Sequence, residues 1–177
     1  MLIEGIPYTR QSSDVVCSTS ACIHMFATFY GVSISPEAVS DGYWEIMSSD
    51  RFREGILFSH ERLESGSISL WCAAKYLNEK LGIPVTTFTT EVDKIYLTYI
   101  KRRIPIIVAG RFPVTGGYVQ NSVIIKGYAG NYAIVNDPKG NALTCYSERM
   151  GENMMYPTML VEQWVGKRTE ILRISTK

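Results

Sequence analysis

The sequence predicts an α+β fold in which helices come first and antiparallel strands follow. Apolar residues recur at spacings of three and four over the first part of the chain, which is typical of helices packed on a core. From about residue 85 onward, short β-branched runs take over, and a turn at Ala129-Gly130-Asn131 separates two of them. Helices followed by antiparallel strands are the segregated order of an α+β domain.

The first predicted helix begins beside Cys17 and ends at Gly31. Its apolar stripe consists of Ala21, Cys22, Met25, Phe26, Phe29 and Tyr30. The spacing of these residues places them on one face, and a glycine commonly ends a helix because it adopts the left-handed conformation without strain.

Two further helices are predicted before the change of pattern. Ser35 provides an N-cap, Pro36 a suitable first helical residue and Glu37 an acid in the first turn, so a helix should run from there toward Met47. A third helix should extend from about Ser67 to Leu81, with Gly82 as its stop.

The second part of the chain reads mainly as strands. We expect a strand over 85–90, a helix over 91–103, a buried strand over 104–110, a hairpin formed by 119–128 and 131–138, and a late strand over 169–175. These segments should form one antiparallel sheet beside the helices.

The bulk composition bounds the class of protein. A chain of 177 residues with 46% hydrophobic and 20% charged residues fits one domain spanning residues 1–177. A net charge of +1 gives no electrostatic attraction to nucleic acid or to an anionic membrane. The first residues lack the pattern of a signal peptide and no run is long enough to span a membrane, so we expect a cytoplasmic or virion-associated protein.

The four cysteines do not indicate a metal site. Cys17, Cys22, Cys72 and Cys145 show no C-x-x-C spacing and no histidine-rich surroundings. We interpret them as free thiols in a reducing compartment, with Cys22, Cys72 and Cys145 in structural roles, and expect neither a metal nor a cofactor.

Several short segments, in order, resemble the papain-like cysteine peptidases, more narrowly the C39-like branch. The segments are IPYTRQ, then Cys17, FYGV, and VIIKGYAGNYAIVNDPKGN. The resemblance covers about two thirds of the chain with gaps. It implies a papain-like fold, with an N-terminal helical half packed on a C-terminal antiparallel sheet and a cleft between Cys17 and Asn121.

The resemblance also implies roles for three residues. Cys17 would be the nucleophile, and the start of a helix suits it because the helix dipole and the unpaired N–H groups stabilise a thiolate. Gln11 would donate to the oxyanion, and Asp137 would orient the general base.

The sequence departs from the family pattern at the base. Asn121 stands where members of the family usually carry histidine, and an amide cannot take up and return the proton of a thiol. His24 lies seven residues beyond Cys17, about 10 Å along the helix. His60 has no local feature that places it near the cysteine.

Alternatives stay open for each of these residues. Cys17 also fits a half-buried structural thiol, Gln11 a surface polar residue, and Asp137 a turn residue that bonds its own backbone.

Two functions fit this pattern. The first is a C39-like peptide or peptidoglycan hydrolase that Asn121 leaves inactive or weakly active. The second is a pseudo-peptidase that uses the cleft or another face for binding or assembly, and the resemblance allows a phage or bacterial origin for it. The expected partner is a peptide, protein or peptidoglycan ligand. Its identity would depend on cleft walls such as residues 48–67, and the oligomeric state stays open.

Overall fold

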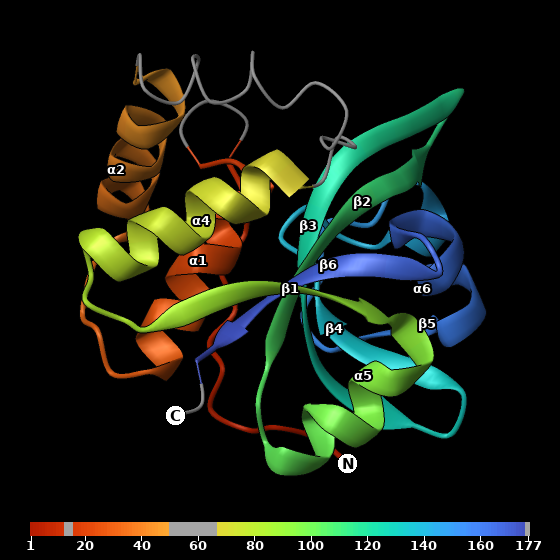
Figure 1. Ribbon diagram of the computed structural model, residues 1–177. Helices are drawn as coiled ribbons and strands as arrows, with labels where there is room; N and C mark the ends of the chain where they lie inside the picture. Colours follow the sequence, from red (N-terminus) through yellow and green to blue (C-terminus); the bar gives the residue numbers. More distant parts are fainter. Residues whose placement is uncertain (13–15, 50–66, 176–177) are drawn as a thin grey trace.

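The computed structural model describes residues 1–12, 16–49 and 67–175 (Figure 1). Three helices, α1 (Ser18–Phe29), α2 (Pro36–Ser48) and α4 (Ser67–Glu79), gather on one side of a sheet. The sheet has six antiparallel strands in the order β1-β6-β2-β3-β4-β5. The predicted α+β architecture, with N-terminal helices on an antiparallel sheet, is therefore confirmed.

The ends of the helices follow from local chemistry. Cys17 is the N-cap of α1, and its sulfur accepts from the N–H of Ser20. Ser35 caps α2 by accepting from the N–H of Ala38, with Pro36 as the first helical residue. The chain leaves α1 through Gly31 at a φ of +88°, a conformation that glycine adopts without strain.

The strands match the apolar runs of the second part of the chain. They are β1 (Val85–Glu91), β2 (Ile106–Val114), β3 (Gly117–Ala129), β4 (Tyr132–Asn136), β5 (Met154–Pro157) and β6 (Arg168–Ile174). β3 and β4 form the predicted hairpin around Gly130. β2 and β3 form a second hairpin, and β6 inserts between β1 and β2.

Three elements of the second part were not predicted, and one predicted helix is shorter than expected. The 3-10 turn η2 (Ala142–Thr144), the edge strand β5 and the helix α6 (Thr158–Val165) lie between β4 and β6 in the sequence. The helix expected over 91–103 is divided into α5 (Val92–Thr98) and a 3-10 turn, η1 (Ile100–Arg102), because Glu91 pairs with Arg168 in the sheet and Arg103 is left-handed at a φ of 59°.

The main core lies between the helices and the sheet. α1 is almost fully buried, with Ile23, Met25 and Phe26 inaccessible to solvent, and the central strands contribute Ile107, Ile124 and other inaccessible side chains. Figure 1 shows α6 on the opposite side of the sheet from α1. There Trp164 packs on Phe112 and Tyr156.

The N-terminal segment is bonded first to β3 and then to the turn that follows β4. The N–H of Ile3 donates to the carbonyl of Lys126 at 2.8 Å, and the N–H of Gln11 donates to the carbonyl of Pro138 at 2.9 Å. These bonds fix the segment before α1 against the turn that follows β4. Gln11, six residues before Cys17, therefore lies beside Pro138, the residue that follows Asp137.

Candidate active site

Asn121 and Asp137 are in direct contact in the interior. Asn121 lies on β3, has 1% of its surface exposed, and donates from Nδ2 to Oδ1 of Asp137 at 2.9 Å. The same nitrogen donates to the hydroxyl of Tyr146 at 2.8 Å. Both amide hydrogens are therefore used, and the side chain is held in one orientation.

The amide oxygen of Asn121 has no hydrogen-bond partner among the residues that the structure describes. A buried acceptor without a partner costs about 1–3 kcal/mol. Asn121 therefore offers an unused acceptor at the position where the family resemblance requires a base.

Asp137 follows β4, is fully buried, and is surrounded by donors. Oδ1 accepts from Asn121 and from the N–H of Lys139 at 3.0 Å. Oδ2 lies 3.3 Å from the hydroxyl of Tyr146 and 3.0 Å from that of Tyr156. The Tyr156 proton is shared with the carbonyl of Gly140 at 3.1 Å, and the charged carboxylate is the stronger acceptor.

Burial and donors act in opposite directions on the charge of Asp137. Burial raises the pKa of its carboxyl group to about 6, while the bonds from Asn121, Lys139 and the two tyrosines partly offset that shift. Burial and the nearby Asp137 charge raise the pKa of both Tyr146 and Tyr156, so these hydroxyls stay protonated. At neutral pH the cluster is a carboxylate held by neutral donors.

The start of α1 is attached to β3 beside Asn121. The N–H of Ser122 donates to Oγ of Ser18 at 3.2 Å, and the hydroxyls of Ser122 and Thr19 lie 2.9 Å apart. Ser18 and Thr19, the two residues that follow the candidate nucleophile, therefore contact Ser122, which follows Asn121.

Cys17 is half-buried at this end of α1. Its sulfur lies 3.4 Å from both the N–H and the hydroxyl of Ser20. The thiol is free, and the N–H of Ser20 at the start of the helix donates to its sulfur. Its role as nucleophile stays a prediction.

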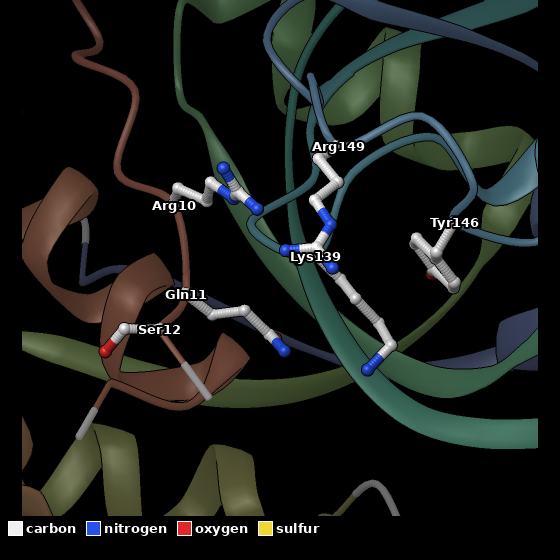
Figure 2. A pocket seen from close by; sticks show the side chains of 6 residues that line it. All are labelled: Arg10, Gln11, Ser12, Lys139, Tyr146 and Arg149. Carbon is white, nitrogen blue, oxygen red and sulfur yellow. The ribbon is translucent and has the colours of Figure 1, made fainter. Parts of the chain in front are cut away.

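Gln11 lines a pocket of about 550 Å³ together with Arg10, Ser12, Lys139, Tyr146 and Arg149 (Figure 2). Figure 2 shows its side chain extending from the N-terminal segment toward the side chain of Lys139. The pocket adjoins the polar cluster because Tyr146 belongs to both. Cys17 is not in this lining, so the oxyanion role of Gln11 also stays a prediction.

Among the described residues, His24 is the one histidine, and both of its ring nitrogens are bonded away from Asn121. Nδ1 of His24 lies 2.7 Å from the hydroxyl of Thr9, and Nε2 lies 3.0 Å from the carbonyl of Ile34. Both ring nitrogens of His24 therefore have a hydrogen-bond partner, and neither is free. His60 and most of the loop expected to form a cleft wall, 50–66, lie outside the described residues.

The other three thiols differ from Cys17 in their exposure to solvent. Cys22 and Cys72 are fully buried, and burial raises the pKa of both, that of Cys72 to about 12. Cys145 is exposed, at a left-handed φ of 50°. Cys17 alone among the four is half-buried at a helix start.

Sequence reasoning missed the two tyrosines that hold Asp137. Tyr146 and Tyr156 follow it by nine and nineteen residues, and no motif marks them. Only the fold of the segment after Gly140 brings them onto the carboxylate. A search for a buried acid in need of donors would have pointed to tyrosines, without saying which.

The fold matches solved structures of C39 peptidase domains. A C39-like peptidase from Bacillus anthracis superposes with a TM-score of 0.61 at 14% identity, covering 99% of this chain and 97% of that one. A double-glycine motif protease from an AMS/PCAT transporter, solved in complex with the leader peptide, gives 0.57 at 16% identity, over 97% and 93%. The peptidase domain of Streptococcus ComA, a bifunctional ABC transporter of a quorum-sensing pathway, gives 0.57 at 17% identity, over 97% and 100%.

No protein-family model matches the chain, and no curated protein does. The predicted papain-like, C39-like fold is confirmed by the structural matches alone. Within the described ranges, no helix is long and apolar enough to span a membrane.

Proposed function

We propose that this protein, with the fold of C39 peptidase domains, binds a peptide-type ligand near Cys17 and Asn121 without cleaving it at an appreciable rate. The observation that carries the proposal is the bond from Asn121 to the buried carboxylate of Asp137 at 2.9 Å. An asparagine there makes the contact that a histidine base would make with its orienting acid, and it supplies none of the proton transfer.

The chemistry of an amide explains the expected loss of activity. A general base must remove the thiol proton and return it to the leaving amine, a contribution of about 10²–10⁴ in rate. The free oxygen of Asn121 can only accept a hydrogen bond. An acceptor of this kind favours an S–H group over a thiolate, which is the opposite of what an imidazolium does.

The features left intact support binding. The start of α1 is bonded to β3 through Ser18, and the N-terminal segment is bonded to the turn after β4 through Gln11. Neither bond uses the side chain of Asn121. A double-glycine motif protease with the same fold was solved with a leader peptide bound, which makes a peptide the first ligand class to test.

The test is a gain of activity. The native protein and the variant Asn121→His should be incubated with a mixed-sequence synthetic peptide library and the products identified by mass spectrometry. Cys17→Ala in each background provides the blank. We expect native cleavage no faster than its blank, and cleavage by Asn121→His about 100-fold or more above its own, because the imidazole can donate to Asp137 and take the thiol proton.

Two results would overturn the proposal. Native cleavage above the Cys17→Ala blank would mean that the protein is an active peptidase despite Asn121. A folded Asn121→His that neither cleaves nor binds any peptide would mean that the fold serves another purpose. Asn121→Gln, which keeps the amide, is the matched control and should stay inactive.

A further inference from the structure

The pocket beside the polar cluster carries three positive charges. Arg10, Lys139 and Arg149 line it, and the remaining lining residues, Gln11, Ser12 and Tyr146, are neutral. We call this the basic pocket. Figure 2 shows Arg10 and Gln11 reaching in from the N-terminal segment and Lys139 and Arg149 from the facing loops.

These cations are not neutralised within the described part of the chain. None of the three forms an ion pair there, and Lys139 only lies over the ring of Tyr146 at 5.5 Å. Glu148, next to Arg149 in sequence, accepts from the side-chain nitrogen of Asn141 at 2.8 Å. The whole chain has a net charge of only +1, so a cluster of three cations without a carboxylate in the lining is a local feature.

The far wall of the basic pocket is fixed before any ligand arrives. The N–H of Asn141 donates to the carbonyl of Glu148 at 2.9 Å and closes the loop between them, so that Lys139 and Arg149 flank its two ends. Gly140 makes this approach possible, because a Cβ at its φ of +126° would lie 2.5 Å from the carbonyl oxygen of Glu148. A preformed site avoids the cost of ordering loops on binding.

Size and chemistry indicate what the basic pocket would hold. A volume of about 550 Å³ lies within the range of about 300–1,000 Å³ typical of ligand sites. Guanidinium groups bind carboxylates through paired hydrogen bonds, and lysine adds a point charge. The hydroxyl of Tyr146 connects this pocket to Asn121, so a ligand anchored there lies beside the polar cluster.

We propose that the basic pocket selects peptides by binding one of their carboxylates, either an acidic side chain or a free C-terminus. The inference rests on the proposed function, because it names the chemistry of the ligand for the same site. A peptide held there by its carboxylate would place its neighbouring backbone next to Gln11 and Tyr146.

Four synthetic pentapeptides separate the two sources of carboxylate. They carry Glu, Gln or Lys at the centre of an acetylated, amidated alanine peptide, with a fourth that has Gln at the centre and a free C-terminus. Dissociation constants are measured by NMR titration of the isotope-labelled protein, with acetate as a probe for simple anion binding. The variant Arg10→Gln/Arg149→Gln removes two charges from the pocket. Lys101→Gln/Arg102→Gln removes two exposed charges from η1 and is the matched control.

We expect one or both carboxylate peptides to bind about 10-fold or more tightly than the neutral and lysine peptides, since about 1.4 kcal/mol corresponds to that factor. The preference should disappear in Arg10→Gln/Arg149→Gln and persist in the control pair. Whichever of the two acidic peptides binds identifies the source of the carboxylate.

Results that overturn the carboxylate preference can be told apart from results that overturn peptide binding altogether. Equal binding of all four peptides, with shifts at Cys17 and Asn121, would overturn the carboxylate preference and leave the proposed peptide-binding function standing. Absence of binding by every peptide would overturn both. Acetate binding as tightly as the peptides, without shifts at Cys17 and Asn121, would reduce the basic pocket to a simple anion site and overturn the inference.

Discussion

Asn121 and Asp137 form a buried polar pair whose chemistry is limited by the amide of Asn121. Each oxygen of the Asp137 carboxylate accepts two hydrogen bonds, which is why a fully buried charge is tolerated there. Asn121 uses both amide hydrogens, and its oxygen, which has no partner among the described residues, can only accept a hydrogen bond. A residue in this pair supports chemistry only if it can gain and lose a proton.

The raised pKa of Asp137 predicts a pH-dependent stability. Its folded pKa of about 6 exceeds the ordinary value of 3.8, so between these values the native state binds more protons than the unfolded state. The free energy of unfolding should therefore fall as pH rises through this window, by on the order of 2 kcal/mol between about pH 4 and pH 7.

Urea unfolding of the native protein and Asp137→Asn at each pH isolates this contribution, because the other titrating groups are common to both. The substitution also loses acceptors for the two tyrosines, which adds an offset that does not vary with pH in this range. The free energy of unfolding of Asp137→Asn minus that of the native protein should increase as pH rises. A difference that moves the other way would mean that the four donors outweigh burial.

At the scale of elements, the contact between α6 and the sheet depends on a glycine. Gly110 lies on β2 opposite Asn121, and a Cβ there would come within 2.3 Å of the carbonyl oxygen of Trp164. Gly110→Ala must therefore displace α6 from the strand. We expect a loss of about 1–3 kcal/mol in the free energy of unfolding, the usual cost of overpacking.

Gly117→Ala is the matched control for this change. Gly117 lies on the paired strand β3, and nothing lies within 4 Å of a Cβ built there. Its free energy of unfolding, measured in urea, should change by no more than about 0.5 kcal/mol. Similar losses in the two variants would show that strand propensity, rather than contact with α6, sets the effect.

The elements that the sequence predicted are those with strong local signals. Ser35-Pro36-Glu37 marks the start of α2 through capping chemistry, and Gly31 and Gly82 end their helices in positive φ. β5 and α6 lack such marks, since Met154–Pro157 is a short edge strand and α6 has no side-chain cap. Their positions are set by packing against β4 and β2, which no local pattern contains.

Over the whole molecule, the fold matches C39 peptidase domains, and an amide stands at the position where the resemblance implies a base. The hairpin of β3 and β4 was predicted, and the structure joins Asn121 on β3 to Asp137, which the resemblance implies as its orienting acid. The two tyrosines and the basic pocket could not be predicted, because each joins segments whose proximity arises only in the folded chain. The fold was therefore predictable from the sequence, whereas only part of the candidate site was.

The most direct test of the missing base is the rate at which iodoacetamide alkylates Cys17 as a function of pH. Cys145→Ser should serve as the background because Cys145 is exposed, whereas Cys22 and Cys72 are buried. We predict alkylation of Asn121→His at least tenfold faster than that of the asparagine protein at about pH 6.5, since an imidazolium stabilises the thiolate. Equal rates, with the asparagine protein already at its maximal rate in mild acid, would show that the protein holds a reactive thiolate without histidine and would contradict the account.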